Sequence, residues 1–193
     1  MERPPGLRFC LYDSARLDAV VDAMAARAAT LFAGASPLAV VGVLRRGAPL
    51  ADRLVERMMR THRISQPLRL DLHVKRYADD LRLLHPHTEL REGAREAAID
   101  LSGHTVLVVD DVLYSGHSIA RVVAHLVSRG AVAVRVAVLV DRGVAALPVH
   151  ADICGLRLEV APGDVVECNV PPFEPDWCIE LLRPDRRPDH AVS

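Results

Sequence analysis

The sequence predicts an α/β fold, a single domain built on a mainly parallel central sheet that is flanked by helices. Strand patterns alternate with helix patterns along the chain, which favours a parallel sheet with right-handed crossovers. Residues 106–109 are apolar on both faces, as is typical of a central strand in such a sheet. The length of 193 residues suits one domain with a sizeable core.

Each expected element follows from the spacing of its apolar side chains. Residues 68–74 alternate apolar and polar side chains, which predicts a half-buried strand, whereas apolar positions after Ser118 have helical spacing. The expected strands are 38–44, 68–74, 106–109, 133–140 and a short last strand at 150–154. The expected helices are 16–32, 49–60 and one that begins near Gly116 and ends at Gly130. The tail adds two further strand patterns, at 165–168 and 177–181.

Several segments lie outside the expected core of residues 38–155. Residues 77–100 form a long polar stretch, and such a stretch in a compact domain is typically a functional loop or disordered. The two strand patterns of the tail predict a small subdomain, and residues 184–193 are expected to be a frayed end. Trp177 in this subdomain is expected to pack in its interior more than to stack on a ligand.

The composition excludes several classes of protein. Half of the residues are hydrophobic and a quarter are charged, which is typical of a soluble globular domain, and no apolar run is long enough to cross a membrane. The four cysteines form no CxxC pair and no metal-ligand spacing, so we expect reduced thiols and a cytoplasmic protein. The formal net charge of −1 provides no overall attraction to nucleic acid.

The most informative motif joins the strand at 106–109 to the helix that follows it. The strand ends in Asp110 and Asp111, and the small-residue loop 114–118 then opens the helix. Backbone N–H groups at a helix start bind anions, which predicts a phosphate site. Two acids beside it require a ligand that also carries hydroxyl groups or a metal ion. A ribose 5-phosphate carries both a phosphate and hydroxyl groups. The alternative is an ordinary strand, turn and helix with an acidic strand end, which would not need the apolar strand, the two aspartates and the small-residue loop in this order.

These residues resemble the 5-phosphoribosyl-1-pyrophosphate (PRPP) signature of type I phosphoribosyltransferases. The resemblance implies that family's fold, with a flexible active-site loop at about 77–100 and a small hood from parts of the N-terminus and about 156–183. Asp110 and Asp111 would hold the ribose hydroxyls, and Asp111 would also help to orient the Mg²⁺-bound PRPP. Mg²⁺ would be held mainly by PRPP, with these two acids contributing through water. The residues that would wrap the ribose and its 5′-phosphate are Asp110, Asp111, Val112, Leu113, Tyr114, Ser115, Gly116, His117 and Ser118.

A second loop, Arg45, Arg46 and Gly47, follows the strand at 38–44. Two guanidinium groups suit a pyrophosphate group, and the glycine is expected to permit an unusual backbone torsion. A solvated arginine pair at a strand end is the alternative, which the downstream signature makes less attractive. The family places its pyrophosphate loop here, often with a non-proline cis peptide. The resemblance therefore implies that Arg46 of this loop and Asp111 of the signature are the catalytic residues.

The resemblance assigns two further groups. Val140, Asp141 and Arg142 lie where this fold tends to place the base. Lys75, Arg76 and Tyr77 border the loop that closes over PRPP in this family.

Further segments resemble one branch of the family, the bifunctional pyrimidine-operon attenuation regulators with uracil phosphoribosyltransferase activity. They are residues 77–81, 110–116, 137–143, 147–148 and 151–152. The implied reaction converts uracil and PRPP to UMP and pyrophosphate, in a homodimer or larger homo-oligomer. Tyr114 stands where enzymes for 6-oxopurines usually carry an aspartate base, so hypoxanthine and guanine are disfavoured.

The chain also departs from this branch, which leaves two alternatives open. It has Arg45 where the family typically has threonine, His117 and Ser118 where it has arginine and threonine, and a different segment after Gly155. A transferase for another heterocyclic base is therefore one alternative. The other is a nucleotide-sensing, RNA-binding regulator with little or no catalysis. RNA binding is possible but not favoured, because the first helix mixes acids with arginines.

Overall fold

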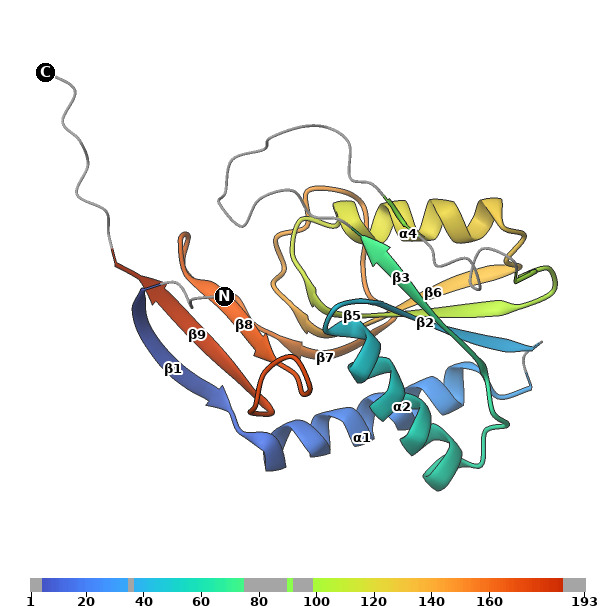
Figure 1. Cartoon of the computed structure of the whole chain (residues 1–193), viewed down its shortest axis with the longest axis horizontal. Coiled ribbons are helices and arrows are strands. Elements are labelled where there is room, and N and C mark those ends of the chain that lie inside the picture. Colours follow the sequence, from blue (N-terminus) through green and yellow to red (C-terminus); the bar gives the residue numbers. More distant parts are fainter. Residues whose placement is uncertain (1–4, 35–36, 75–89, 92–98, 186–193) are drawn as a thin grey trace, which may run out of the picture.

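The structure, a computed structural model, describes residues 5–34, 37–74, 90–91 and 99–185. Its main sheet has six strands in the order β4-β3-β2-β5-β6-β7 (Figure 1). They are β2 (Leu38–Leu44), β3 (Leu68–Val74), β4 (Leu90–Arg91), β5 (Thr105–Leu113), β6 (Ala133–Asp141) and β7 (Ile153–Arg157). Five of them run parallel, and β4 pairs antiparallel with β3 at one edge. This sheet confirms the predicted fold class.

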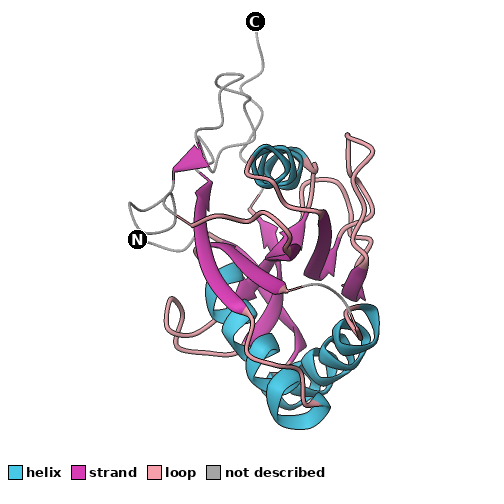
Figure 2. Ribbon diagram, turned by 90° about the vertical axis from the view of Figure 1, so that its right-hand side faces the viewer, coloured by secondary structure: helices cyan, strands magenta, loops and turns pink. Residues whose placement is uncertain are grey.

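Helices cover both faces of the main sheet (Figure 2). The helices α1 (Ser14–Leu31) and α2 (Gly47–His62) pack on one face, and α4 (His117–Ser128) packs on the other. Alternate residues of β2 and β5 contribute to the two resulting core clusters, because successive side chains of a strand point to opposite faces. No helix in the described residues is long and apolar enough to cross a membrane.

A second, three-stranded antiparallel sheet, here called the hood sheet, has the order β1-β9-β8. Its strands are β1 (Gly6–Tyr12), β8 (Val165–Asn169) and β9 (Cys178–Pro184). The connection between β8 and β9, residues 170–177, is called the hood turn. Trp177 at its end is 8% exposed, with Arg53 over its ring at 4.9 Å and its indole N–H donating to Asp18 at 3.3 Å. Trp177 is therefore a packing residue, as predicted.

The largest differences between the structure and the expected elements lie in β1, β9 and β7. The sequence pattern predicts no strand at residues 6–12, yet they form β1, whose pairing partner lies at the other end of the chain, as in Gly6 opposite Pro184. The same pairing carries β9 through Pro184, where a frayed end was expected. The last strand of the main sheet is 153–157 rather than 150–154. It continues through Gly155, where a Cβ would lie 2.7 Å from the Leu139 carbonyl oxygen and 2.9 Å from Met24 Sδ, so glycine allows α1 to pack closely there.

The predicted flexible loop is covered only in part. Lys75, Arg76 and Tyr77 lie outside the described residues, as do most of residues 77–100. Within that range, Leu90–Arg91 form β4 and residues 99–100 are described.

Candidate active site

The three loops singled out in the sequence lie at one edge of the main sheet. They follow β2, β5 and β6, which are adjacent parallel strands. The pairing of Gly42 with Val109 and of Leu113 with Asp141 places the three strand ends side by side. Ligands of open α/β sheets bind at this carboxyl edge.

The two acids of the signature are buried within the last residues of β5. Asp110 is 2% exposed and Asp111 is 8% exposed. The Asp111 N–H donates to Asp110 Oδ1 at 2.9 Å, and Asp111 Oδ2 lies 3.9 Å from Arg46 Nη1. The Cys168 thiol donates weakly to the Asp111 carbonyl at 4.0 Å. Burial, together with the charge of Asp111, raises the pKa of Cys168 well above its ordinary value, so this thiol supports the strand end and is no nucleophile.

The loop after these acids forms the entry to α4. Gly116 adopts φ +85°, a left-handed conformation that favours glycine, and α4 then begins at His117. No side chain caps this helix and its first turn holds no acid, whereas Asp13 caps α1 by accepting from Arg16 N at 2.9 Å. The start of α4 is therefore suited to an anion supplied by a ligand.

The signature residues differ in what they offer to that anion. Leu113 is 2% exposed and packs in the core, and its carbonyl accepts from Arg142 N at 3.1 Å, so it supports the loop rather than meeting a ligand. Val112 and Ser118 are partly buried, Tyr114 and His117 are exposed, and Ser115 is partly buried with its carbonyl accepting from Ala146 N at 3.0 Å.

The loop after β2 carries a cis peptide bond between Leu44 and Arg45, as the family resemblance implies. It leads directly into α2 at Gly47. A Cβ on Gly47 would lie 2.5 Å from the Val109 carbonyl oxygen and 3.1 Å from Asp110 Cα. The expectation that this glycine permits an unusual torsion is wrong, because its φ is not positive. Glycine is needed here because α2 starts in contact with the strand that carries the acids.

Glu174 of the hood turn binds Arg46, and the sequence analysis missed this contact. Arg46 donates from Nε at 3.0 Å and from Nη2 at 2.6 Å to Glu174 Oε1, while Glu174 Oε2 accepts from Val170 N at 3.0 Å. Next to it, the Arg45 guanidinium lies 5.6 Å from the centroid of the Phe173 ring. The partners Arg46 and Glu174 are 128 positions apart, and no local pattern marks such a pair.

The pKa values of this pair move in opposite directions. Burial acts to lower the pKa of Arg46, but the hydrogen bonds that it donates to Glu174 and the charges of Asp111 and Glu174 outweigh it, so the pKa is raised. Burial acts to raise the pKa of Glu174, but hydrogen bonds from Arg46 and Val170 outweigh it, so the pKa is lowered. Both side chains are therefore charged at neutral pH.

The loop after β6 divides into buried and accessible parts. Val140 is fully buried in the core, so its side chain is not available to a base. Asp141 shapes the loop, since its Oδ1 accepts from Gly143 N at 2.8 Å. Arg142 lies over the Tyr114 ring at 4.8 Å and donates from Nη2 to the Asp164 carbonyl at 3.1 Å, while its Nε is buried with no hydrogen-bond partner in the described part of the chain.

A magnesium ion could be held here only with help from a ligand. Among the described residues, no group of three or more His, Cys, Asp or Glu side chains is placed to hold a metal ion. Asp110 and Asp111 do supply carboxylate oxygens, which Mg²⁺ prefers, on one short segment of backbone. The donor set thus fits an ion whose remaining oxygens come from substrate and water.

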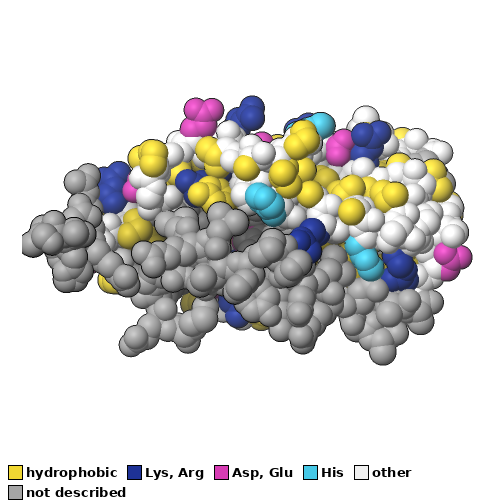
Figure 3. All heavy atoms as spheres, turned by 90° about the horizontal axis from the view of Figure 1, so that it is seen from above, with side chains coloured by type: hydrophobic (Ala, Val, Ile, Leu, Met, Phe, Trp, Pro, Cys, Tyr) yellow, Lys and Arg dark blue, Asp and Glu magenta, His cyan; other side chains and the backbone are white. Residues whose placement is uncertain are grey.

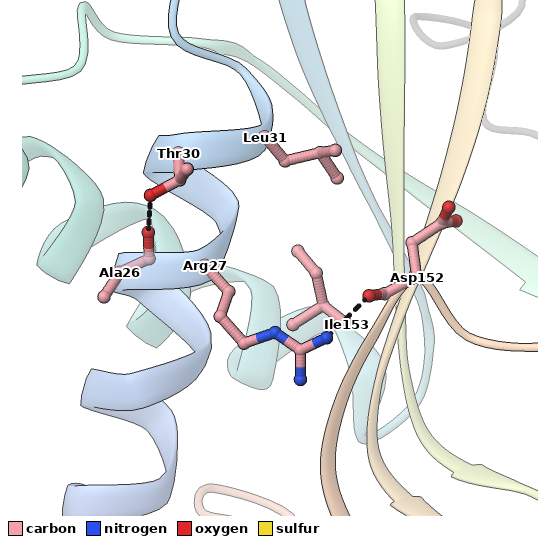
Figure 4. Close-up of a pocket in the computed structure, with 6 residues that line it drawn as sticks. All are labelled: Ala26, Arg27, Thr30, Leu31, Asp152 and Ile153. Carbon is pink, nitrogen blue, oxygen red and sulfur yellow. Dashed lines mark hydrogen bonds between the residues drawn. The ribbon is translucent and has the colours of Figure 1, made fainter.

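Two hollows lie elsewhere, between α1 and β7, with volumes of about 390 Å³ and 350 Å³. Figure 4 shows the first, where Arg27 reaches from α1 and donates to the Asp152 carbonyl at 3.1 Å. None of the residues predicted for the site lines either hollow. We place the candidate site at the three loops, since acids, guanidiniums and a helix start meet there.

Comparison with known proteins agrees with this geometry. Residues 11–172 match the family model described as the phosphoribosyl transferase domain. The bifunctional protein PyrR of Deinococcus radiodurans is 34% identical over 153 residues, which are 79% of this chain and 82% of that protein. PyrR of Roseiflexus sp. is 40% identical over 83 residues, and this match spans 43% of the chain and only 44% of the relative.

Solved structures share the fold at low sequence identity. The hypoxanthine phosphoribosyltransferase of Trypanosoma cruzi superposes with a TM-score of 0.73 at 17% identity, covering 95% of both chains. A second structure of that enzyme has a TM-score of 0.71 at 18% identity, covering 91% of this chain and 97% of the other. With the family match over most of its length and the shared fold, this chain belongs to the type I phosphoribosyltransferase family and is similar to the PyrR proteins.

Proposed function

We propose that the protein transfers the phosphoribosyl group of PRPP to a nucleobase, with uracil as the substrate, and releases UMP and pyrophosphate. One observation carries this proposal: the ends of the neighbouring strands β2 and β5 bring together a buried acid pair, an uncapped helix start and a guanidinium pair. These are the groups that ribose hydroxyls, a 5′-phosphate and a pyrophosphate require.

In the proposed reaction a base nitrogen attacks the anomeric carbon of PRPP as pyrophosphate leaves. Asp110 and Asp111 hold the ribose hydroxyls, and the start of α4 holds the 5′-phosphate, so the anomeric carbon is fixed between base and leaving group. Arg46 stabilises the charge that develops on the pyrophosphate oxygens. Mg²⁺, when bound with PRPP, supplies further neutralisation of that charge. Closure of the loop bordered by Lys75, Arg76 and Tyr77 would exclude water and prevent hydrolysis.

The choice of base rests on Arg142 and Tyr114. Arg142 Nε–H is a buried donor with no partner among the described residues, so the side chain would have to turn for this N–H to meet a carbonyl oxygen of the base, and gaining that partner would favour the turn. Uracil carries two such carbonyl groups. Tyr114 in place of an acidic base disfavours 6-oxopurines, whereas a different heterocycle with a carbonyl group would fit the same description.

The RNA-binding alternative gains little from the surface of α1. Its acids Asp18 and Asp22 both accept from Arg57, at 2.7 Å each, so cations and anions are paired on this side. Figure 3 shows basic and acidic side chains scattered among hydrophobic ones on the described part of another face. Such a mixture differs from the basic stripe that many phosphate contacts need. A cytoplasmic location and a homo-oligomeric state remain predictions from the sequence.

The test is pyrophosphate release from PRPP with Mg²⁺ in the presence of uracil, orotate, hypoxanthine, guanine or adenine. Release with uracil, with UMP as the second product, is expected. Release with another base in its place would keep the transfer and change the substrate. No release with any base, combined with no binding of PRPP, would contradict the proposed function.

A further inference from the structure

Glu174 is a charged residue of the candidate site to which the proposed reaction gives no role. One of its carboxylate oxygens accepts two N–H groups of Arg46, and the other accepts the backbone N–H of Val170 at 3.0 Å. The backbone of the hood turn thus fixes the carboxylate through Oε2, and Oε1 faces the guanidinium of Arg46. Such an anchored acid differs from a surface carboxylate that can rotate away.

The contact also sets the direction in which Arg46 points. Glu174 accepts from Nε and Nη2 of Arg46, while Nη1 lies 3.9 Å from Asp111 Oδ2, on the side of the two acids of β5. Because the guanidinium is planar and rigid, fixing two of its nitrogens fixes the third. Nη1 is therefore held toward the place where PRPP would bind.

The pair is more sheltered than an ordinary surface ion pair. The side chain of Arg46 is 33% exposed and that of Glu174 is 13% exposed, so solvent screens their interaction only in part. Arg45 provides a comparison, because it is exposed and meets the hood turn through the ring of Phe173 rather than through a hydrogen bond. The hood turn contacts both arginines but orients only Arg46.

We propose that Glu174 is a positioning residue, which holds Arg46 in the orientation that meets the pyrophosphate group of PRPP. This inference rests on the proposed function, from which the role of Arg46 is taken. Glu174 itself touches no reacting atom. An arginine that is ordered before the ligand arrives loses less conformational freedom on binding than one that rotates freely.

The sign of the effect separates this role from a simple charge effect. A carboxylate beside an anion site repels the anion, so charge alone predicts tighter pyrophosphate binding once Glu174 is removed. Loss of orientation predicts weaker binding. Glu174→Ala therefore gives opposite results for a positioning residue and for a neighbouring charge.

The experiment measures the affinity of the full chain for inorganic pyrophosphate with Mg²⁺ by calorimetry. The variants are Glu174→Ala, Arg46→Ala and the two combined. We expect Glu174→Ala to weaken binding about tenfold, and Arg46→Ala to weaken it further. The double variant should bind no more weakly than Arg46→Ala alone, because Glu174 acts through Arg46. Unchanged or tighter binding by Glu174→Ala overturns the proposal, as do losses that simply add.

A matched control is Glu167→Ala, which removes another partly buried ion pair of the hood. Glu167 in β8 accepts from Arg8 of β1 at 3.0 Å, and the two side chains are 19% and 20% exposed. Glu167→Ala should leave the affinity for pyrophosphate unchanged. If it lowers the affinity as much as Glu174→Ala does, the stability of the hood sheet is the cause and the proposal is overturned. If Glu174→Ala does not fold, Glu174→Gln offers one acceptor oxygen in place of two. Tighter binding in Glu174→Gln than in the wild type would overturn the positioning role, because removal of a neighbouring charge would then explain the change.

The outcome is distinguishable from a failure of the proposed function. Pyrophosphate binding needs no base, so the coupling between Glu174 and Arg46 can be confirmed even if no base supports turnover. Absence of turnover would then overturn the transfer reaction alone. A wild-type protein that binds no pyrophosphate would overturn both the pyrophosphate role of Arg46 and the positioning role of Glu174.

Discussion

Asp111 on β5 and Glu174 in the hood turn are both acids near Arg46, yet their relations to it differ. Arg46 Nη1 lies 3.9 Å from Asp111, beyond hydrogen-bond distance, whereas Arg46 Nη2 lies 2.6 Å from Glu174. Glu174 is committed to a partner within the protein. Asp111 Oδ2 makes no hydrogen bond to Arg46. This carboxylate oxygen can therefore accept from the hydroxyl groups of a ligand.

The two sides of the site also differ in how the chain builds them. The sheet side, residues 105–128, is one continuous strand, loop and helix. The hood side joins residues that lie 128 positions apart. We therefore expect loss of the sheet-side acids to cost more PRPP affinity than loss of the hood contact, which acts on the pyrophosphate group alone.

The largest expected effect comes from the acids of the sheet side. Asp110→Asn combined with Asp111→Asn keeps the shapes of both side chains and removes two charged acceptors. Each hydrogen bond to a charged group contributes roughly 1.5–3 kcal/mol, so PRPP affinity should fall by at least about 100-fold. Calorimetric titration with PRPP measures the change, and thermal unfolding checks that the variant is folded.

The matched control changes the same number of charges away from the site. Asp18→Asn with Asp22→Asn removes two acids of α1 that pair with Arg57. PRPP affinity should stay within about threefold of wild type in this control, because exposed pairs contribute little. Wild-type PRPP affinity in the variant with Asp110→Asn and Asp111→Asn would disprove the assignment of the ribose site.

The next effect separates binding from reaction. Arg46→Ala should lower kcat roughly 10²–10³-fold, as loss of one donor to a developing charge typically does. The affinity for UMP should change less than about threefold, because UMP carries no pyrophosphate. Steady-state kinetics and UMP titration measure the two quantities. Equal losses in both would place Arg46 on the nucleotide side of the site.

The main sheet, including the sheet side of the site, could be predicted well from the sequence, because its information is local. The strand pattern at 106–109 lies within β5, and the helix expected near Gly116 begins at His117. Strands 38–44 and 68–74 match β2 and β3 at both ends. In each case the apolar period and the turn residues lie in the same short segment as the element that they predict.

The hood side could not be predicted in the same way. The strand β1 becomes recognisable through its pairing with β9, and Glu174 through its contact with Arg46, and neither partner is near in sequence. Gly47 lies between these two cases. The sequence draws attention to it as a loop glycine, but the reason for a glycine there, close contact of α2 with β5, requires the packed structure.

That close contact gives a third, smaller effect. Gly47→Ala should destabilise the protein by about 1–3 kcal/mol, as overpacking does, and should also weaken PRPP binding because α2 must move away from Asp110. Gly34→Ala is the control, since a Cβ there meets nothing within 4 Å and only its φ of +72° opposes alanine. Urea unfolding should show losses in both variants. Weakened PRPP binding in both alike would mean that stability, rather than the contact at Asp110, governs binding.

The smallest effect concerns the pH dependence of the pair between Arg46 and Glu174. The folded protein lowers the pKa of Glu174, so the pair's contribution to stability is fully present above the unfolded-state pKa of about 4.3 and is lost as pH falls through the lower folded value. Glu174→Gln removes this contribution, which we expect to be about 1 kcal/mol for a partly screened pair. The difference in unfolding free energy between wild type and variant, measured by urea titration from pH 7 downward, should therefore shrink in acid. Because every other carboxylate titrates in both proteins, only Glu174 contributes to this difference. A difference that stays constant well below pH 4 would show that the ionised pair does not hold the hood turn to the loop.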